Sequence, residues 1–206
     1  FREYLSILKE IRKEKFDIAI DAQMMLKSMY WMAFCGAKRR IISRQARELS
    51  FLGANEIIPP ITQDHEHPVI KCYMKFADYL GADTSEIKVT LPERDIEIKA
   101  KADEFLKDVK SPIVVIAPAT TWANKHWNKD YWRQVVEGLS QSCSIVFTGG
   151  TSDNELIEYI SGGKYLNLAG KTNIMELAEI FSRADVVLAP DSGSAHLAWA
   201  TQKPFV

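Results

Sequence analysis

The sequence predicts an α/β protein in which two units each contain a parallel β-sheet. Short apolar runs rich in β-branched residues alternate with stretches of helical periodicity, most regularly after Ser111. Strands and helices that alternate at this spacing form βαβ units. Of the 206 residues, 47% are hydrophobic and 26% are charged, which suits a globular chain with a sizeable core. We expect an N-terminal unit with a linker over residues 1–100 and a C-terminal unit over residues 101–206.

The elements of the N-terminal unit are predicted from the spacing of apolar residues and from turn residues between them. In chain order we expect a helix over 1–12, a strand over 16–21, a buried helix over 24–34, a cation-rich loop over 38–48, loops at 59–60 and 62–67, a helix over 69–80, and a linker with one strand over 89–101. Gly36 and Gly81 are expected to end the second and third helices.

The C-terminal unit has a more regular pattern. Its strands are predicted over 113–117, 144–148, 165–168 and 185–189, and a further strand starts at Pro204. Its helices are predicted over 129–139, 154–160, 174–182 and 195–200. This order of elements is typical of a parallel sheet with helical crossovers.

Charge, cysteine content and hydropathy exclude several classes of protein. Lys and Arg number 26 and Asp and Glu 27, so the net charge of −1 argues against a general nucleic-acid binder. The three cysteines are far apart and lack the spacing of a zinc or redox motif, which indicates reduced thiols. No apolar run approaches the ~20 residues that cross a bilayer. The chain begins with Phe1 rather than Met and stops within a predicted strand, so we expect a piece of a longer protein.

The loop after the first strand of the C-terminal unit carries hydroxyl and cationic side chains. It contains Thr120, Thr121 and Lys125. Ligands of open parallel sheets collect beyond the carboxyl ends of the strands, and two hydroxyls with a lysine suit a phosphate there. The alternative is that a threonine caps a turn and that Lys125 is a solvated surface residue.

The loop after the fourth strand of this unit is small and polar. Ser192 and Gly193 at a helix start leave backbone N–H groups free to face an anion, which the helix dipole also favours. Asp191 suits sugar hydroxyls, and His196 lies in the first turns of the same helix. The alternative is a simple cap made by Asp191 or Ser192, with His196 packing on the helix. Together the two loops predict a diphosphate or nucleotide site.

Three other patterns are assigned structural roles. Gly149-Gly150 follows a strand but lacks the spacing of a dinucleotide site, so we expect a plain turn. His65-Glu66-His67 lacks the rest of a ligand set, so we expect no metal. The aromatic residues from Trp122 to Trp132 are assigned to packing rather than to base stacking. The sequence shows no pattern of nucleophile, base and acid, which argues against a serine or cysteine hydrolase.

The N-terminal unit contains a cation-rich patch. Five cations lie within ten residues, with Lys71 as a further candidate; they are Lys38, Arg39, Arg40, Arg44 and Arg47. Such a patch suits a phosphorylated or carboxylated sugar, or the head groups of an anionic membrane. A solvated loop is the ordinary alternative.

These residues resemble glycosyltransferase family 9, the bacterial lipopolysaccharide heptosyltransferases. The segment 120–127 is similar to the family's donor-binding loop, and Asp191-Ser192-Gly193-Ser194-Ala195-His196 matches its Asp-(Ser/Thr)-Gly-x-x-His signature. In the first unit, Asp21-Ala22-Gln23, Lys27-Ser28 and Ala46-Arg47-Glu48 resemble the heptosyltransferase I branch. Met24 stands where the family usually has Gly, and Lys71 stands where an arginine is expected.

The resemblance implies a GT-B architecture of two Rossmann-like domains, both incomplete in this chain. It implies inverting transfer of heptose from ADP-heptose to Kdo of an anionic lipid A precursor, at the cytoplasmic face of the bacterial inner membrane, with no metal or other cofactor and no nucleic acid. Lys125 would stabilise the leaving diphosphate, and the general base would lie upstream of Phe1. The donor-binding residues would be Thr120, Thr121, Lys125, Asp191, Ser192, Gly193 and His196, and the acceptor-binding residues would be Gln23, Lys27, Arg44, Arg47 and Lys71.

Three other functions remain open at this point. One is a family 9 transferase with another sugar or acceptor, such as a heptosyltransferase II. Another is a nucleotide-sugar 2-epimerase, which shares the fold but needs more acidic residues and histidines in the cleft than the sequence offers. The third is a nucleotide-binding module without catalysis, since the chain alone is expected to be inactive.

Overall fold

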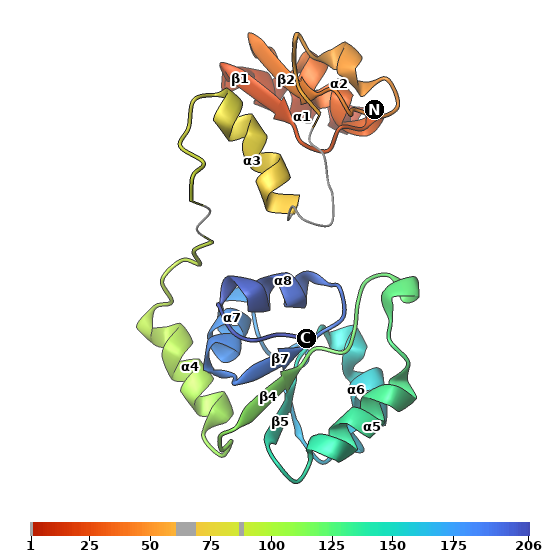
Figure 1. The fold of residues 1–206 in the computed structure, drawn as a ribbon, viewed down its shortest axis with the longest axis vertical. Coiled ribbons are helices and arrows are strands. Elements are labelled where there is room, and N and C mark those ends of the chain that lie inside the picture. The colour runs from red at the N-terminus through yellow and green to blue at the C-terminus, as the bar shows by residue number, and fades with distance from the viewer. Residues whose placement is uncertain (1, 61–68, 87–88) are drawn as a thin grey trace. The chain divides into compact units, whose positions relative to one another are not determined.

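Two compact units make up the chain, Phe1–Lys88 and Val89–Val206. The computed structural model describes residues 2–60, 69–86 and 89–206, and each unit has its own parallel sheet (Figure 1). The boundary between the units lies after Lys88, whereas we expected the N-terminal unit and its linker to end at residue 100. Within the described ranges, no helix is long and apolar enough to cross a lipid bilayer.

The first unit is built on a three-stranded parallel sheet in the order β1-β2-β3. Its elements are α1 (Arg2–Lys13), β1 (Ile18–Asp21), α2 (Leu26–Phe34), β2 (Arg39–Ser43), the 3-10 turn η1 (Ser50–Gly53), β3 (Glu56–Ile58) and α3 (Val69–Tyr79). The central strand β2 buries Ile41 against Phe76 of α3, and Ile42 against Met24 and Met32. The three predicted helices and the first predicted strand of this unit are confirmed.

The cation-rich stretch 38–48, which we interpreted as a loop, contains strand β2, so that interpretation is wrong. Strand β2 pairs in parallel with β1 on one side and with β3 on the other. Its apolar run is only Ile41-Ile42, between Arg40 and Ser43, and is too short to show the alternation that predicts a strand. Strand β3 was not predicted for the same reason, since its apolar run is only Ile57-Ile58.

The expected linker over 89–101 contains no strand in the structure and instead leads into helix α4 (Ile96–Leu106). Asp95 starts this helix, because its Oδ1 accepts a hydrogen bond from the N–H of Ile98 at 2.8 Å. Ala102 and Leu106, which are four residues apart, are buried in one core cluster with residues of α7 (Ile174–Arg183). The charged residues between them hid this spacing in the sequence.

The second unit has a four-stranded parallel sheet in the order β6-β5-β4-β7. Its other elements are β4 (Ile113–Ile116), the 3-10 turn η2 (Ala123–Lys125), α5 (Lys129–Leu139), β5 (Ser144–Phe147), the 3-10 turn η3 (Thr151–Asp153), α6 (Asn154–Ser161), β6 (Leu166–Asn167), β7 (Val186–Leu188) and α8 (Gly193–Ala200). Helices α4, α7 and α8 pack on one face, and α5 and α6 on the other (Figure 1). The four predicted strands and four predicted helices are confirmed, whereas the strand expected from Pro204 is present only as an isolated parallel bridge of Phe205 with Val187.

Strands β4 and β7 are neighbours in this sheet although β5, β6 and three helices separate them in the chain. The register pairs Val115 with Val187, while β5 lies on the opposite side of β4. The strand order therefore reverses between β4 and β7. In open parallel sheets, ligands bind outside the carboxyl ends of the strands at this point of reversal. The loops that follow β4 and β7 lie there.

Candidate functional site

A lysine and an aspartate from the two loops are in direct contact at the reversal point. Lys125 Nζ lies 2.5 Å from Asp191 Oδ2, and both side chains are exposed to solvent. The hydrogen bond and the charge of Lys125 lower the pKa of Asp191, and the charge of His196 adds to this effect. The structure thus brings together two residues that the sequence analysis assigned to one site.

The loop after β4 is held by short internal hydrogen bonds. The carbonyl oxygen of Trp122 accepts from Thr120 Oγ1 at 2.8 Å and from the N–H of Lys125 at 2.9 Å. His126 Nε2 lies 2.8 Å from the carbonyl oxygen of Thr120. The hydroxyl of Thr120 therefore closes a turn, as our alternative interpretation expected, and this turn fixes the backbone that carries Lys125.

A pocket of about 650 Å³ opens between the loops of this edge. Its volume lies within the range of small-molecule sites, roughly 300–1,000 Å³. Its lining residues are Ala119, Thr120, Thr121, Gly150, Ser152, Asp153, Ile174, Leu177, Ser192, Gly193, Ser194 and Leu197. Four predicted donor-binding residues are among them, whereas Lys125 lines a neighbouring apolar pocket of about 500 Å³ with Trp127 and Trp132.

The first turn of α8 is open toward the larger pocket. Ser192 occupies the N-cap position but makes no side-chain capping bond, and its Oγ is buried without a hydrogen-bond partner in the described structure. A Cβ built on Gly193 would meet no protein atom within 4 Å. Neither Asp191 nor Ser192 caps the helix, so the N–H groups of this turn are available to an anion.

The turn after β5 contributes residues to the site that the sequence did not predict. Asp153 Oδ2 accepts from the N–H of Gly150 at 2.7 Å, so the expected plain turn is confirmed. A Cβ on Gly149 would lie 2.7 Å from the same carboxylate oxygen, which explains the glycine. Gly150, Ser152 and Asp153 nonetheless line the pocket. Their position after β5, next to β4, was the signal available in the sequence.

The cation-rich patch of the first unit is divided between the two ends of β2. Arg39 binds Glu56 through Nε and Nη2, both at 2.7 Å, and Arg40 donates to the carbonyl oxygens of Gly53 and Ala37. These two arginines therefore stabilise the fold at the amino end. Arg44 and Arg47 follow the carboxyl end, and the N–H of Arg47 donates to the carbonyl oxygen of Met24 at 2.9 Å.

Gln23 and Lys27 belong to the same edge of the first sheet, because they follow β1 as Arg44 and Arg47 follow β2. Lys71 is placed differently. It lies on α3, in a groove of about 460 Å³ that Lys75, Asp78 and Thr84 also line. His65-Glu66-His67 lies outside the described residues.

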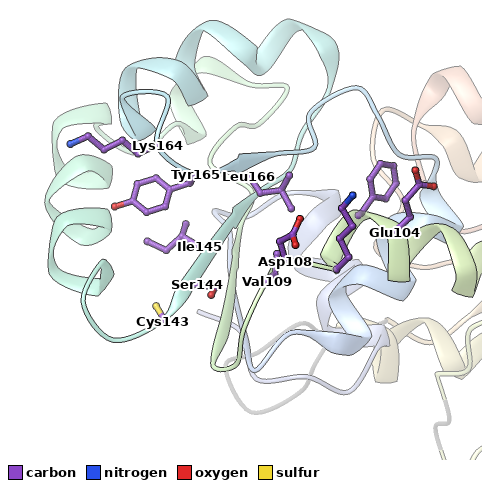
Figure 2. A pocket seen from close by; sticks show the side chains of 11 residues that line it. Glu104, Asp108, Val109, Cys143, Ser144, Ile145, Lys164, Tyr165 and Leu166 are labelled. Carbon is purple, nitrogen blue, oxygen red and sulfur yellow. The ribbon is translucent and has the colours of Figure 1, made fainter.

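A further pocket, of about 580 Å³, opens at the amino ends of β5 and β6 (Figure 2). It mixes acidic Glu104 and Asp108 with basic Lys107 and Lys164, and so has no net attraction for an ion of one sign. It lies at the edge of the sheet opposite to the two loops. The candidate site is therefore the pocket at the carboxyl ends of the strands.

Comparison with known proteins gives concordant matches over nearly the whole chain. The model of glycosyltransferase family 9 (heptosyltransferase) matches residues 4–206. The lipopolysaccharide core heptosyltransferase OpsX of Haemophilus influenzae is 29% identical over 210 residues, which cover 98% of this chain and 59% of OpsX. This chain therefore spans less than two thirds of the length of that relative.

Two solved structures share the fold. The E. coli heptosyltransferase WaaC with ADP-2-deoxy-2-fluoro heptose aligns with a TM-score of 0.73 at 23% identity, over 99% of this chain and 64% of that one. The E. coli ADP-heptose lps heptosyltransferase II aligns with a TM-score of 0.73 at 18% identity, over 97% of this chain and 64% of that one. The α/β fold with parallel sheets is that of these GT-B heptosyltransferases.

Proposed function

Because this chain belongs to glycosyltransferase family 9, the heptosyltransferases, we propose that it is part of an enzyme that transfers heptose from ADP-heptose to Kdo of the lipopolysaccharide inner core. The observation that carries the proposal is the Lys125–Asp191 contact beside an open helix N-terminus at the reversal point of the second sheet. In this assignment the second unit binds the nucleotide sugar and the first unit binds the acceptor.

The diphosphate of the donor is assigned to the first turn of α8. Its free N–H groups, the unpartnered Oγ of Ser192 and the hydroxyl of Thr121 offer donors to phosphate oxygens. The space in front of Gly193 leaves room for the phosphate to approach the backbone. No metal is required by this arrangement, because a lysine and a helix end supply positive potential.

The nucleoside is assigned to the part of the pocket between η3, α7 and α8. Ile174, Leu177 and Leu197 provide apolar surface for a base, and the carboxylate of Asp153 is an acceptor for ribose hydroxyls. Each of these groups lines the same pocket as the α8 turn.

Lys125 is assigned to the leaving group. Charge grows on the ADP diphosphate as the bond to the anomeric carbon breaks, and a fixed cation stabilises that charge. In the free protein Lys125 is paired with Asp191. When the donor binds, Lys125 would exchange Asp191 for the diphosphate as its anionic partner. We assign the released Asp191, with His196, to the sugar.

The acceptor is assigned to the carboxyl edge of the first sheet. Lys27, Arg44 and Arg47 supply cations there and Gln23 an amide, which suits the carboxylates of Kdo and the phosphates of lipid A. We also assign Lys71 to this acceptor, although it stands on α3. We assign the enzyme, with its anionic lipid acceptor, to the cytoplasmic face of the inner membrane.

Transfer to a heptose rather than to Kdo is the second candidate. Its support is that the curated relatives of this chain also include a lipooligosaccharide heptosyltransferase 2 of Haemophilus influenzae, 23% identical over 215 residues. The test uses full-length protein that contains this chain, with ADP-heptose and one of three additions: a Kdo-terminated acceptor, a heptose-terminated acceptor, or none. ADP release only with the Kdo acceptor supports the proposal, and release only with the heptose acceptor supports the second candidate. Turnover of UDP-N-acetylglucosamine without acceptor would indicate an epimerase.

A further inference from the structure

Helix α7 carries two buried glutamates on the side that faces α4. Glu176 and Glu179 have only 6% and 7% of their surface exposed. Glu176 Oε1 lies 2.8 Å from Lys101 Nζ, and Glu179 Oε2 lies 2.9 Å from Arg94 Nε. Arg183 Nε adds a second contact to Glu179 at 3.0 Å. Buried carboxylates need such partners, because an unpaired charge in the interior is strongly destabilising.

The two glutamates differ in what their carboxylates hold. Glu176 Oε2 accepts from the N–H of Asn173 at 2.8 Å, while Asn173 Oδ1 accepts from the N–H groups of Met175 and Glu176, each at 2.9 Å. This reciprocal pair of bonds is a capping box that fixes the first turn of the helix. Glu179, one turn later, takes no part in it.

The capped turn is also a wall of the candidate nucleotide pocket. Ile174 and Leu177 line that pocket, and Ile174 has 68% of its surface exposed. The first residue of α7 is therefore a large apolar side chain that is exposed to solvent. Lys101 binds the same turn from 75 residues away in the sequence.

We propose that Lys101 is a positioning residue for the nucleotide pocket. By binding Glu176 it fixes the capped turn of α7, and so holds Ile174 and Leu177 where they contact the nucleoside of a bound donor. This inference rests on the proposed function, since it takes the ligand of the pocket to be the nucleotide.

The chain offers a matched control for this role in the Arg94–Glu179 pair. It joins a cation before α4 to the same helix α7, at a similar distance and with an equally buried carboxylate. It differs from the Lys101–Glu176 pair in lying outside the capping box and in having Arg183 as a second cation on its carboxylate. A role limited to holding α4 and α7 together is shared by the two pairs, so loss of either cation would then have a similar effect on ADP binding.

The experiment compares Lys101→Met, Arg94→Met and Lys101→Arg in the full-length protein. ADP affinity is measured by calorimetry, and hydrogen exchange of the amides of residues 173–177 is measured without nucleotide. We expect Lys101→Met to weaken ADP binding by about fivefold or more, a typical size for coupling between sites. The same variant should speed exchange in the capped turn and raise the KM of the donor more than it lowers kcat. Arg94→Met should leave ADP affinity unchanged, and Lys101→Arg should restore most of it.

Equal ADP affinity in Lys101→Met and Arg94→Met, with wild-type protein binding ADP, would overturn the positioning role and leave the proposed function intact. Failure of the wild-type protein to bind ADP would instead overturn both. Faster exchange throughout α7 in Lys101→Met, rather than in its first turn alone, would indicate a structural role only and would also count against the inference.

Discussion

Lys125 and Asp191 are 66 residues apart in the sequence, yet their side chains are 2.5 Å apart at the edge where β4 and β7 end. The contact depends on the pairing of these two strands, since each residue lies in the loop that follows one of them. The pair joins the two loops that the sequence predicts to form one site.

Replacing Lys125 by alanine removes the cation assigned to the leaving diphosphate. We expect turnover of ADP-heptose to fall by about 100-fold or more, as loss of one group that stabilises developing charge does. The rate of ADP release in the full-length protein measures this. Lys129→Ala is the control, because Lys129 Nζ lies over the ring of Tyr159 and lines neither pocket of this edge. Unchanged kinetics in Lys125→Ala would contradict the assignment.

Asp191→Asn removes a negative charge that competes with phosphate for Lys125. We expect ADP to bind about two- to fivefold more tightly, the range that an exposed ion pair allows. Sugar transfer should nonetheless slow, because the carboxylate assigned to the donor sugar is lost. Calorimetry and initial rates measure the two effects, and weaker ADP binding would exclude the competition.

Gly193→Ala tests whether the space before α8 belongs to a ligand. No protein atom opposes the new methyl group, and alanine is the better helix former by about 1 kcal/mol, so thermal stability should be kept or raised. ADP affinity should fall by about tenfold or more, since each 1.4 kcal/mol of lost contact is tenfold.

Gly138→Ala in α5 is the matched control, because its added methyl group also meets nothing within 4 Å. It lines no part of the pocket and should leave ADP affinity unchanged. Equal ADP affinity in both alanine variants would mean that no ligand approaches Gly193.

Acid should destabilise the second unit through Glu176. The hydrogen bond from Lys101, with that from the N–H of Asn173, lowers the pKa of Glu176 below its ordinary value. The unfolded chain, with a glutamate pKa of about 4.3, then binds more protons than the folded one. The stabilisation is present above about pH 4.3 and is lost as the pH falls through the folded-state pKa.

Lys101→Met weakens this dependence, because it removes the largest cause of the lowered pKa. Thermal unfolding between about pH 3 and 6 should show a smaller loss of stability in the variant than in the wild type. Parallel curves would show that the ion pair does not set the pKa.

Met24→Gly separates backbone strain from packing. Met24 has a φ of 57°, which favours glycine, but its side chain is buried with Met32 and Ile42. The strain relieved is about 1–2 kcal/mol, whereas emptying a buried methionine site costs about 2–5 kcal/mol, so we expect a net loss of stability. Urea unfolding measures it, and a more stable variant would contradict the packing argument.

Long, uninterrupted periodicity made the second unit predictable. Residues 113–116 are apolar and all buried, and helix α5 has the predicted bounds. Elements were missed where apolar pairs or single residues lie among charges, as at Ile41-Ile42 in β2 and at Ala102 and Leu106 in α4. These residues are buried by tertiary contacts with distant parts of the chain, and a local sequence pattern does not show such contacts.

The candidate site was predictable where polar residues lie in a loop that follows a strand, as Thr120, Lys125 and Asp191 do. Asp153 was not predicted because the glycines before it indicate a plain turn. In the structure Asp153 both holds this turn and lines the pocket. The division of the cation-rich patch could not be foreseen, since it depends on a strand whose two ends face opposite edges of the sheet.

Because β4 pairs with β7, the pocket at this edge is complete only when both strands are in the sheet. One helical crossover connects β4 to its neighbour β5. Pairing of β4 with β7 instead closes a loop that contains β5, β6 and three helices. Contacts between distant segments form slowly, because the closure entropy must be overcome first. A newly made chain that already has β4, β5 and β6 in place still lacks one side of its pocket, so binding competence reports the completion of the sheet.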